Sequence, residues 1–432
     1  MVKGLGWFGI VRLGLVQSAI GASVMLSTSL LNRIMTVELA LPLALPAGLV
    51  AWHYGVQLAR PLWGHGSDRG ARRTPWIVGG MAALMLGSLI AVDSLGLLAE
   101  RAALGYAMAI AAYALIGAGV GAAGTSLLAL LATLVAPERR AAAAATSWIM
   151  MIAGIVITAA IASKLLDPFT PFRLAMVSGG ISVGAFLLAW GAVRGVEPRG
   201  IAPPVETDTP GQSFGGALRE MLGERDARHF TAFVFLSMLA YSMQDLILEP
   251  FAGLVFGLTP GQSTGLSGVQ HGGVLLGMLL AGIGGSAFGG GAPAVLRRWI
   301  VGGCVGSALA LAGLGIAAGV GPAWPLALNV WLLGFANGVF AVAAIGAMMG
   351  LASSAGEARE GLRLGVWGAA QAIAFGLGGL SGALGVDALR ALGGGAESFA
   401  GVFAVEAGLF LAAALLATGM RAGVPRLREA ML

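Results

Sequence analysis

Stretches of 20 or more mostly apolar residues recur from one end of the chain to the other. A helix needs about 20 such residues to cross the roughly 30 Å hydrocarbon core of a bilayer. Only 10% of the 432 residues are charged, whereas a soluble globular domain carries about 25% charged residues. The sequence therefore predicts an all-α membrane protein and leaves no room for a separate soluble domain.

The apolar stretches divide into twelve predicted transmembrane helices, in two groups of six. The first group covers 12–32, 39–63, 74–98, 104–135, 141–163 and 172–193. The second group covers 229–251, 261–289, 297–320, 324–351, 364–386 and 399–420. The chain is thus predicted to consist of an N-terminal half (1–193), a linker (194–228) and a C-terminal half (229–432).

The distribution of Lys and Arg predicts the orientation. Cytoplasmic loops collect these residues. If both termini are cytoplasmic, 20 of the 25 Lys and Arg residues lie on that side, and five lie outside: Arg33, Arg101, Lys164, Arg173 and Arg390. This imbalance favours twelve spans with both termini cytoplasmic. It also accounts for the net charge of +5 without a nucleic-acid partner.

The linker is the only long polar stretch, and its second part has helical periodicity. Phe214, Leu218, Met221 and Leu222 fall on one stripe, with charged residues largely opposite. This pattern predicts an amphipathic helix on the cytoplasmic surface. A simple tether between the halves and a regulatory element are both compatible with it.

Glycine is abundant, with 71 residues, about twice its usual share near 7%. Several glycines are spaced four residues apart within the spans, a spacing that lets helix backbones approach closely. The pairs are Gly117 and Gly121, Gly302 and Gly306, Gly334 and Gly338, and Gly378 and Gly382. They predict tight helix packing.

The loop between the second and third spans reads GHGSDRGARR and resembles the loop signature of major-facilitator transporters. The matching residues are Gly64, Asp68, Arg69, Arg72 and Arg73, while Ala71 replaces a glycine. Six spans, a linker and six further spans also fit that fold, whose halves are pseudo-symmetric. The resemblance implies that the loop forms part of a cytoplasmic gate.

A few ionisable residues interrupt the spans, and each is a candidate functional residue because a charge is costly in hydrocarbon. They are Arg33, Glu38, Asp245, Glu249 and Glu406. Asp245 and Glu249 share a helix face, where their charges repel, and Arg33 is their expected partner. Two interpretations stay open: a structural ion pair that closes the outer side, and the charged wall of a ligand cavity.

Two histidines, His53 and His271, occupy matching spans of the two halves. Trp52 and Gln57 accompany the first, and Gln270 the second. A neutral imidazole can hydrogen-bond a neighbouring helix, relay protons or ligate a metal. The single cysteine, Cys304, indicates neither a disulfide nor a metal site, and no catalytic motif is present, so an enzyme is not predicted.

Three segments, 12–42, 53–81 and 244–264, resemble the bacteriochlorophyll delivery family of the major facilitator superfamily, which includes the PucC and LhaA proteins of purple phototrophic bacteria. The most specific part is QDLILEPFAGLVF at 244–256. The resemblance covers nearly the whole chain. It implies a multi-pass protein of the bacterial inner, photosynthetic membrane that binds or delivers bacteriochlorophyll, or a precursor, to nascent light-harvesting polypeptides.

The implied partners are light-harvesting antenna subunits, bacteriochlorophyll-synthesis enzymes, the membrane insertion machinery and lipids. The pigment is the only cofactor expected. We hypothesise that His53 or His271 ligates its magnesium and that Gln57, Gln244 and Gln270 bond its ring carbonyl groups. Trp52, next to His53, is a further candidate ligand-binding residue. Two alternatives are a scaffold for pigment-synthesis enzymes that holds no pigment, and a proton-coupled solute transporter that uses Asp245, Glu249 or Glu406.

Overall fold

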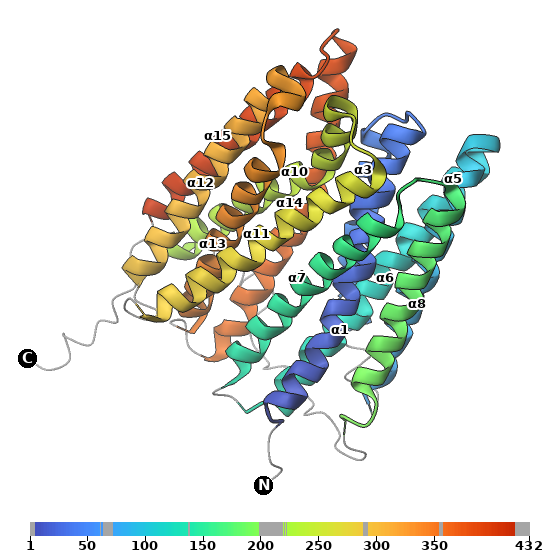
Figure 1. Cartoon of the computed structure of the whole chain (residues 1–432). Coiled ribbons are helices and arrows are strands. Elements are labelled where there is room, and N and C mark those ends of the chain that lie inside the picture. Colours follow the sequence, from blue (N-terminus) through green and yellow to red (C-terminus); the bar gives the residue numbers. More distant parts are fainter. Residues whose placement is uncertain are drawn as a thin grey trace, which may run out of the picture.

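The computed structural model describes residues 5–60, 62–63, 72–136, 139–197, 219, 221, 223–287, 293–353 and 357–419. The described chain is a bundle of long helices (Figure 1). A bilayer offers no water to backbone N–H and C=O groups, so a spanning segment must pair them internally, as a helix does. Three of the four stripe residues of the predicted amphipathic linker helix, Phe214, Leu218 and Leu222, lie outside the described residues, as do the loop residues Gly64, Asp68 and Arg69.

The first six spans correspond to one group of helices. The first span runs from Trp7 to Glu38 through α1 (Trp7–Met25), η1 (Leu26–Leu30), α2 (Leu31–Arg33) and η2 (Ile34–Glu38). The others are α3 (Ala44–Gln57), α5 (Thr74–Glu100), α6 (Ala102–Leu134), α7 (Arg140–Leu165) and α8 (Pro171–Val193).

The second group has the same number of spans. It comprises α10 (Arg225–Phe256), α11 (Pro260–Ala287), α12 (Pro293–Val320) followed by the short η4 (Gly321–Ala323), α13 (Leu326–Ser353), α14 (Glu357–Ala391) and α15 (Glu397–Gly419). Eleven of the helices in the described residues are long and apolar enough to cross a membrane. The remaining one, α3, has 14 residues as described. The prediction of an all-α, multi-pass membrane protein is confirmed.

Two predicted helix ends were wrong. The first span was expected to end at 32, but η1 and η2 continue it to Glu38 as π-helical turns. The seventh was expected to end at 251, but α10 passes through Pro250 to Phe256 and ends where Gly257 adopts a φ of 67°. Polar residues had suggested an interruption, yet in a packed bundle a π-turn or an internal proline is tolerated because neighbouring groups satisfy the freed backbone atoms.

The packing inside the two groups follows one plan. In the first group α1 packs on α7 and α8, α3 on α6, and α5 on α6 and α8. The corresponding spans of the second group make the same pairs: α10 with α14 and α15, α11 with α13, and α12 with α13 and α15. This repetition is the pseudo-symmetry expected of a major-facilitator fold. The chain boundaries predicted for the halves and linker stay a prediction.

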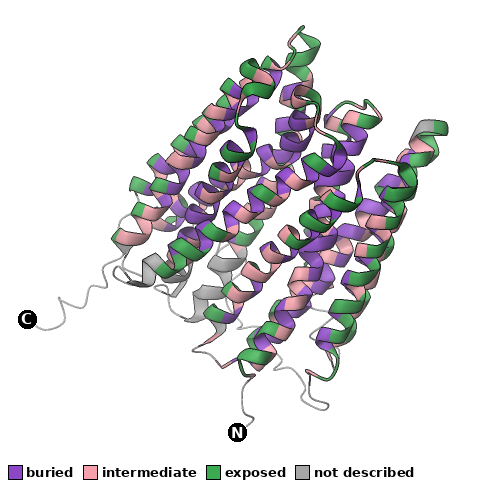
Figure 2. Ribbon diagram, in the orientation of Figure 1, coloured by how far each residue is buried: buried purple, intermediate pink, exposed green. Residues whose placement is uncertain are grey.

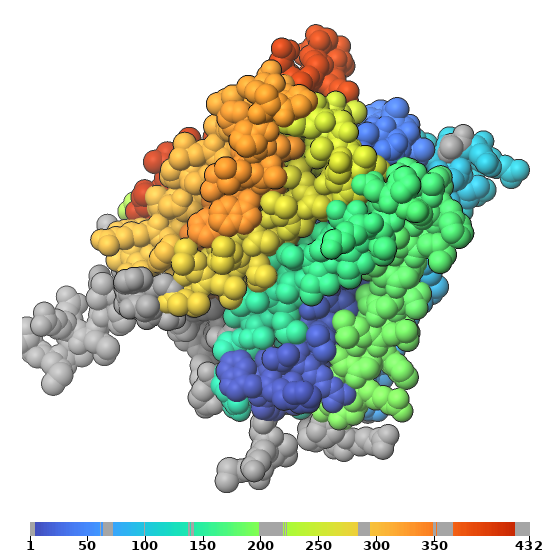
Figure 3. All heavy atoms as spheres, viewed as in Figure 1, coloured from blue at the N-terminus to red at the C-terminus, as the bar shows by residue number. Residues whose placement is uncertain are grey.

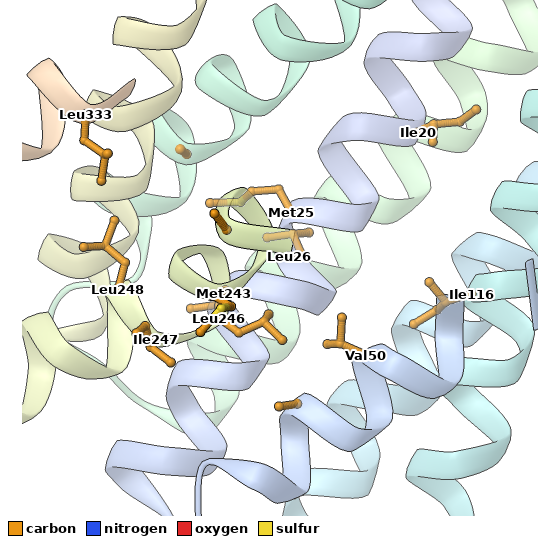
Figure 4. Packing of buried hydrophobic residues seen from close by; sticks show 14 of the residues in the cluster. Ile20, Met25, Leu26, Val50, Ile116, Met243, Leu246, Ile247, Leu248 and Leu333 are labelled. Atoms are coloured by element: carbon orange, nitrogen blue, oxygen red, sulfur yellow. The ribbon is translucent and has the colours of Figure 1, made fainter. Parts of the chain in front are cut away.

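Between the groups, α7 packs on α11 and α3 packs on α14. The start of α1 and the end of α15 lie at the same end of the bundle, which we call the terminal end, and we call the other the distal end (Figure 1). Buried residues lie mainly toward the interior of the bundle and exposed residues mainly on its outside (Figure 2). Deep in the interior, Met25 and Leu26 of the first span lie near Met243 and Leu246 of α10 (Figure 4).

Hydrogen bonds between the groups hold the distal end together. The amide of Asn32 donates to the Leu246 carbonyl over 2.6 Å. The Asp387 carboxylate of α14 accepts from the backbone N–H groups of Leu43 and Ala44, at 3.0 and 2.7 Å, and so caps the start of α3. Negative charge suits the amino end of a helix, where N–H groups lack helical partners.

Glycines set the helix spacing at most of the predicted pairs. A Cβ on Gly334 of α13 would lie 1.9 Å from the Gln270 carbonyl oxygen of α11, and one on Gly338 would lie 2.1 Å from that of Val274. At Gly302 of α12, by contrast, a Cβ would meet nothing within 4 Å. The close approach of α11 to α13 therefore depends on glycine.

We predict that Gly334→Ala lowers the unfolding temperature of the detergent-purified protein, since α11 and α13 must move apart, with a cost of about 1–3 kcal/mol. Gly302→Ala is the matched control and should leave the temperature unchanged or slightly raised, because alanine favours helix more than glycine does. Equal unfolding temperatures for the two variants would show that the predicted backbone contact is not made.

Candidate ligand-binding site

Five side chains from four helices meet in the interior between the two groups. We call them the central cluster: Tyr54 of α3, Tyr241 and Asp245 of α10, His271 of α11 and Phe375 of α14. The Phe375 ring lies 5.6 Å from the Tyr54 ring and 5.7 Å from the Tyr241 ring, measured between centroids. Asp245 lies near His271 and near both tyrosines.

The helices bring these residues together in a simple way. Tyr241 and Asp245 lie one turn apart on α10 and so share a face, while α14 packs on both α10 and α3. Asp245 is half-buried and forms no hydrogen bond or ion pair with another described residue. Aromatic surface with a few convergent polar groups is typical of a small-molecule site, and major-facilitator proteins bind ligands between their halves.

His271 and His53 are placed differently. His271 is 7% exposed, and its Nδ1 lies 2.9 Å from the Ser267 carbonyl oxygen, which leaves Nε2 without a partner among the described residues. His53 is 1% exposed; its Nε2 lies 2.7 Å from Gln57 Nε2, and its Nδ1 is enclosed without a partner. The His53 ring also lies 4.9 Å from the ring of Tyr54, its neighbour in sequence, measured between centroids.

The other predicted ligand-binding residues do not join the cluster. Trp52 is 46% exposed and donates to the Ile110 carbonyl of α6 over 3.2 Å, on the outside of the bundle. Gln57 accepts a hydrogen bond from Arg60 and stays with His53. Gln244 and Gln270 are buried, and both amide atoms of Gln244 lack partners among the described residues.

The predicted charge network divides into separate sites. The Arg33 guanidinium pairs with Glu38 at 2.6 Å and donates to the Leu258 carbonyl at 2.7 Å, so it forms its ion pair with neither Asp245 nor Glu249. Ser267 donates to Glu249 over 2.5 Å, although Arg33 still interacts electrostatically with that carboxyl. Arg33 therefore ties the end of the first span to the segment that follows α10, and the expected ion pair with Asp245 and Glu249 was wrong.

Glu406 of α15 lies apart from these residues. Its carboxyl group is fully buried, and neither oxygen has a hydrogen-bond partner among the described residues. No ion pair or hydrogen bond with another described residue holds this side chain, so its position depends on packing.

At the terminal end, the two described residues of the gate loop converge on an acid that sequence reasoning missed. The Glu197 carboxylate accepts from the backbone N–H groups of Arg73 and Thr74, at 2.7 and 2.9 Å, and from the Thr74 hydroxyl at 2.7 Å. Arg72 Nε lies 3.8 Å from it. Arg73 also donates to the Ala129 carbonyl over 2.6 Å, so the loop is tied to α6 as well.

The chain was compared with known proteins. The model of a family described as PUCC protein matches residues 30–423. The chain belongs to the PUCC protein family. One relative, the bacteriochlorophyll synthase 44.5 kDa chain of Rhodobacter capsulatus, is 51% identical over 96% of each chain. Another, Protein PucC of Cereibacter sphaeroides, is 30% identical over 93% of this chain and 90% of its own length.

Among solved structures, this PUCC-family chain is similar to a bacterial homolog of the human lysosomal transporter Spinster, crystallised in an inward-facing and unoccupied conformation. The TM-score is 0.65, the sequences are 16% identical, and 96% of this chain and 95% of that one are covered. A likeness of this kind shows the fold, and it confirms the major-facilitator prediction.

Sequence reasoning also missed Tyr54, Tyr241 and Phe375. A signal was available, because the chain has only four tyrosines, and these two lie beside predicted functional residues: Tyr54 follows His53, and Tyr241 precedes Asp245 by one turn. Asp387 gave no comparable signal, because nothing in the sequence pairs it with the start of α3.

We predict that Glu197 stabilises the fold in a pH-dependent way. Burial raises the pKa of Glu197, but hydrogen bonds from Arg73 and Thr74 and the charge of Arg72 outweigh this and lower the pKa below its usual value. A lowered folded-state pKa gives stability that is present above the ordinary carboxyl pKa of about 4.3 and is lost as the pH falls through the folded value.

The measurement is the unfolding temperature of wild type and Glu197→Gln as a function of pH. The variant should be less stable at pH 7, and the difference should shrink as the pH falls below about 4.3. Exposed Glu100 at the end of α5 is the control, and Glu100→Gln should change little at any pH. A gap between wild type and Glu197→Gln that does not depend on pH would contradict the assignment.

Proposed function

We propose that this protein handles bacteriochlorophyll, or a precursor, during the assembly of photosynthetic complexes, and brings it to nascent light-harvesting polypeptides in the bacterial photosynthetic membrane. The proposal rests mainly on one relative, which is 51% identical over 96% of both chains and is named bacteriochlorophyll synthase 44.5 kDa chain. The match to the PUCC family model across residues 30–423 supports the same proposal.

The residue types of the central cluster suit a ligand of this chemistry. Bacteriochlorophyll is a flat aromatic macrocycle with a central magnesium that takes an axial ligand. Tyr54, Tyr241 and Phe375 supply aromatic surface, which stabilises flat rings by offset or edge contacts. His271 has a ring nitrogen without another partner and is the residue that would ligate the magnesium. His53 does not fit that role, because both its nitrogens lie within packed protein.

We further propose that the protein is not itself the catalyst of pigment synthesis. The name of the 51% identical relative contains the word synthase, but the fold is that of a transporter, and the residues of the central cluster form no arrangement of nucleophile and general base. In this proposal, synthesis enzymes, antenna subunits and the insertion machinery are partners that supply or receive the pigment.

The test is an absorption spectrum and pigment extraction of the protein purified gently from a phototrophic host. Wild type should carry a bacteriochlorophyll-type pigment in stoichiometric amount. His271→Leu should reduce the retained pigment about tenfold or more, which corresponds to about 1.4 kcal/mol of lost ligation. His229→Leu, which changes a partly exposed histidine at the start of α10, is the control and should retain the pigment.

Either of two results would overturn part of this proposal. A colourless wild type that retains antenna or synthesis proteins would favour a scaffold without pigment. Full pigment retention in His271→Leu, with the spectrum of the wild type, would show that this imidazole is not the ligand.

The second candidate function is proton-coupled transport, and one observation favours it. Asp245 is a half-buried acid without a bond to another described residue. Acids inside the membrane relay protons in transporters. Reconstituted vesicles with a pH-sensitive dye inside test it. Proton uptake that is abolished by Asp245→Asn would favour transport. We expect the wild type to take up no protons in this assay.

A further inference from the structure

A groove lies on the outside of the bundle and shares no residue with the central cluster. It is a groove of about 820 Å³ between α1, α7 and α8. Figure 3 looks onto this face, where α7 and α8 flank the more deeply placed α1. Its size lies within the range of roughly 300–1,000 Å³ that is usual for small-molecule sites.

Glycines open the groove and determine its depth. Gly154 of α7 packs against Ser18 of α1 so closely that a Cβ there would lie 2.4 Å from the Ser18 carbonyl oxygen. On the opposite wall, a Cβ on Gly180 or Gly184 of α8 would meet nothing within 4 Å. The missing side chains therefore leave space that no neighbouring residue fills.

The walls of the groove are apolar and exposed, as expected of a surface that faces hydrocarbon. They include Ile157, Ile161, Phe172 and Met176, which are 59%, 45%, 74% and 62% exposed. A hydrocarbon chain lying along them would replace contacts with mobile lipid by contacts with a fixed surface, and small residues favour close approach of this kind.

Two cations line the distal end of the same groove, Lys164 in the last turn of α7 and Arg173 in the first turn of α8. The macrodipole of α7 accommodates Lys164, but a cation in the first turn of α8 is disfavoured by the dipole of that helix. Arg173 donates to the Asp167 carbonyl over 2.7 Å, and no carboxylate of the described residues forms an ion pair with either cation. An anion bound between Lys164 and Arg173 would neutralise this excess positive charge.

These cations also depart from the overall charge distribution. In the orientation predicted from the sequence they are two of only five Lys and Arg residues outside the cytoplasm. Lys and Arg normally concentrate in the cytoplasmic loops of membrane proteins, so cations on the opposite side are unusual. Two of these five line one groove. Their position beside an apolar hollow matches the chemistry of a lipid with an anionic headgroup.

We propose that the groove between α1, α7 and α8 is a binding site for an anionic phospholipid, with its headgroup phosphate at Lys164 and Arg173 and an acyl chain over Gly180 and Gly184. This site does not depend on pigment binding at the central cluster. The lipid fills the surface of the N-terminal half next to α7, a helix that packs on α11 of the other half.

The experiment uses the full chain, exchanged into vesicles of phosphatidylcholine with or without phosphatidylglycerol, extracted in detergent, and analysed for retained lipid by native mass spectrometry. Wild type should retain phosphatidylglycerol in preference to phosphatidylcholine. Lys164→Gln should lower this preference about fivefold, the effect of about 1 kcal/mol for one cation near a membrane surface. Gly184→Leu should abolish retention of both lipids, because the new side chain occupies the groove.

Matched controls separate the site from general effects. Arg390→Gln removes another cation predicted on the same side of the membrane, and Gly408→Leu adds a side chain to an exposed glycine of α15 with open space beside it. Both should retain lipid as the wild type does. The elution profile of each variant in size-exclusion chromatography shows that it is folded.

Three outcomes would overturn the proposal. Equal retention of the two lipids by wild type would show that no anionic headgroup is recognised. Unchanged phosphatidylglycerol in both Lys164→Gln and Gly184→Leu would place the lipid elsewhere. A pigment or a polypeptide helix that is lost with Gly184→Leu, in place of a phospholipid, would identify a different occupant of the groove.

Discussion

Backbone hydrogen bonding in the absence of water is the constraint on which the rest of this structure depends. Each spanning segment must satisfy its own N–H and C=O groups, and only a helix does so within a single segment. Once the chain consists of helices in lipid, hydrophobic burial no longer drives them together, and close van der Waals packing must do so. The glycine contacts of α11 with α13, at Gly334 and Gly338, provide that packing.

Three charged side chains stabilise helix ends or the contact between the two helix groups. Asp387 caps α3, Glu197 caps α5, and Arg33 bonds the Leu258 carbonyl across the interface. Each satisfies backbone atoms that helix geometry leaves without partners. The half-buried Asp245 is different, because it stabilises no helix end and forms no bond with another described residue, and for this reason we chose the central cluster as the candidate site.

The candidate site could be predicted from the sequence only in part. Asp245 and His271 were predicted because ionisable residues are conspicuous in apolar spans. His53 stood out for the same reason, yet it turns toward Gln57 inside the first helix group. Helical periodicity places residues on a face but does not say which neighbour covers that face. Phe375 could not be connected with Tyr54 in advance, because 321 positions in sequence separate residues that meet only when α3 packs on α14.

The sequence by itself determined the number and approximate position of the spans, the all-α class and the family resemblance, because length and hydrophobicity decide whether a segment can cross a bilayer. Only the tertiary structure decided that the first span continues through π-turns to Glu38, that His53 is enclosed beside Gln57, and that Lys164 and Arg173 line one groove. These features depend on which helix faces meet, and that is set by packing between distant segments, about which a local pattern carries no information.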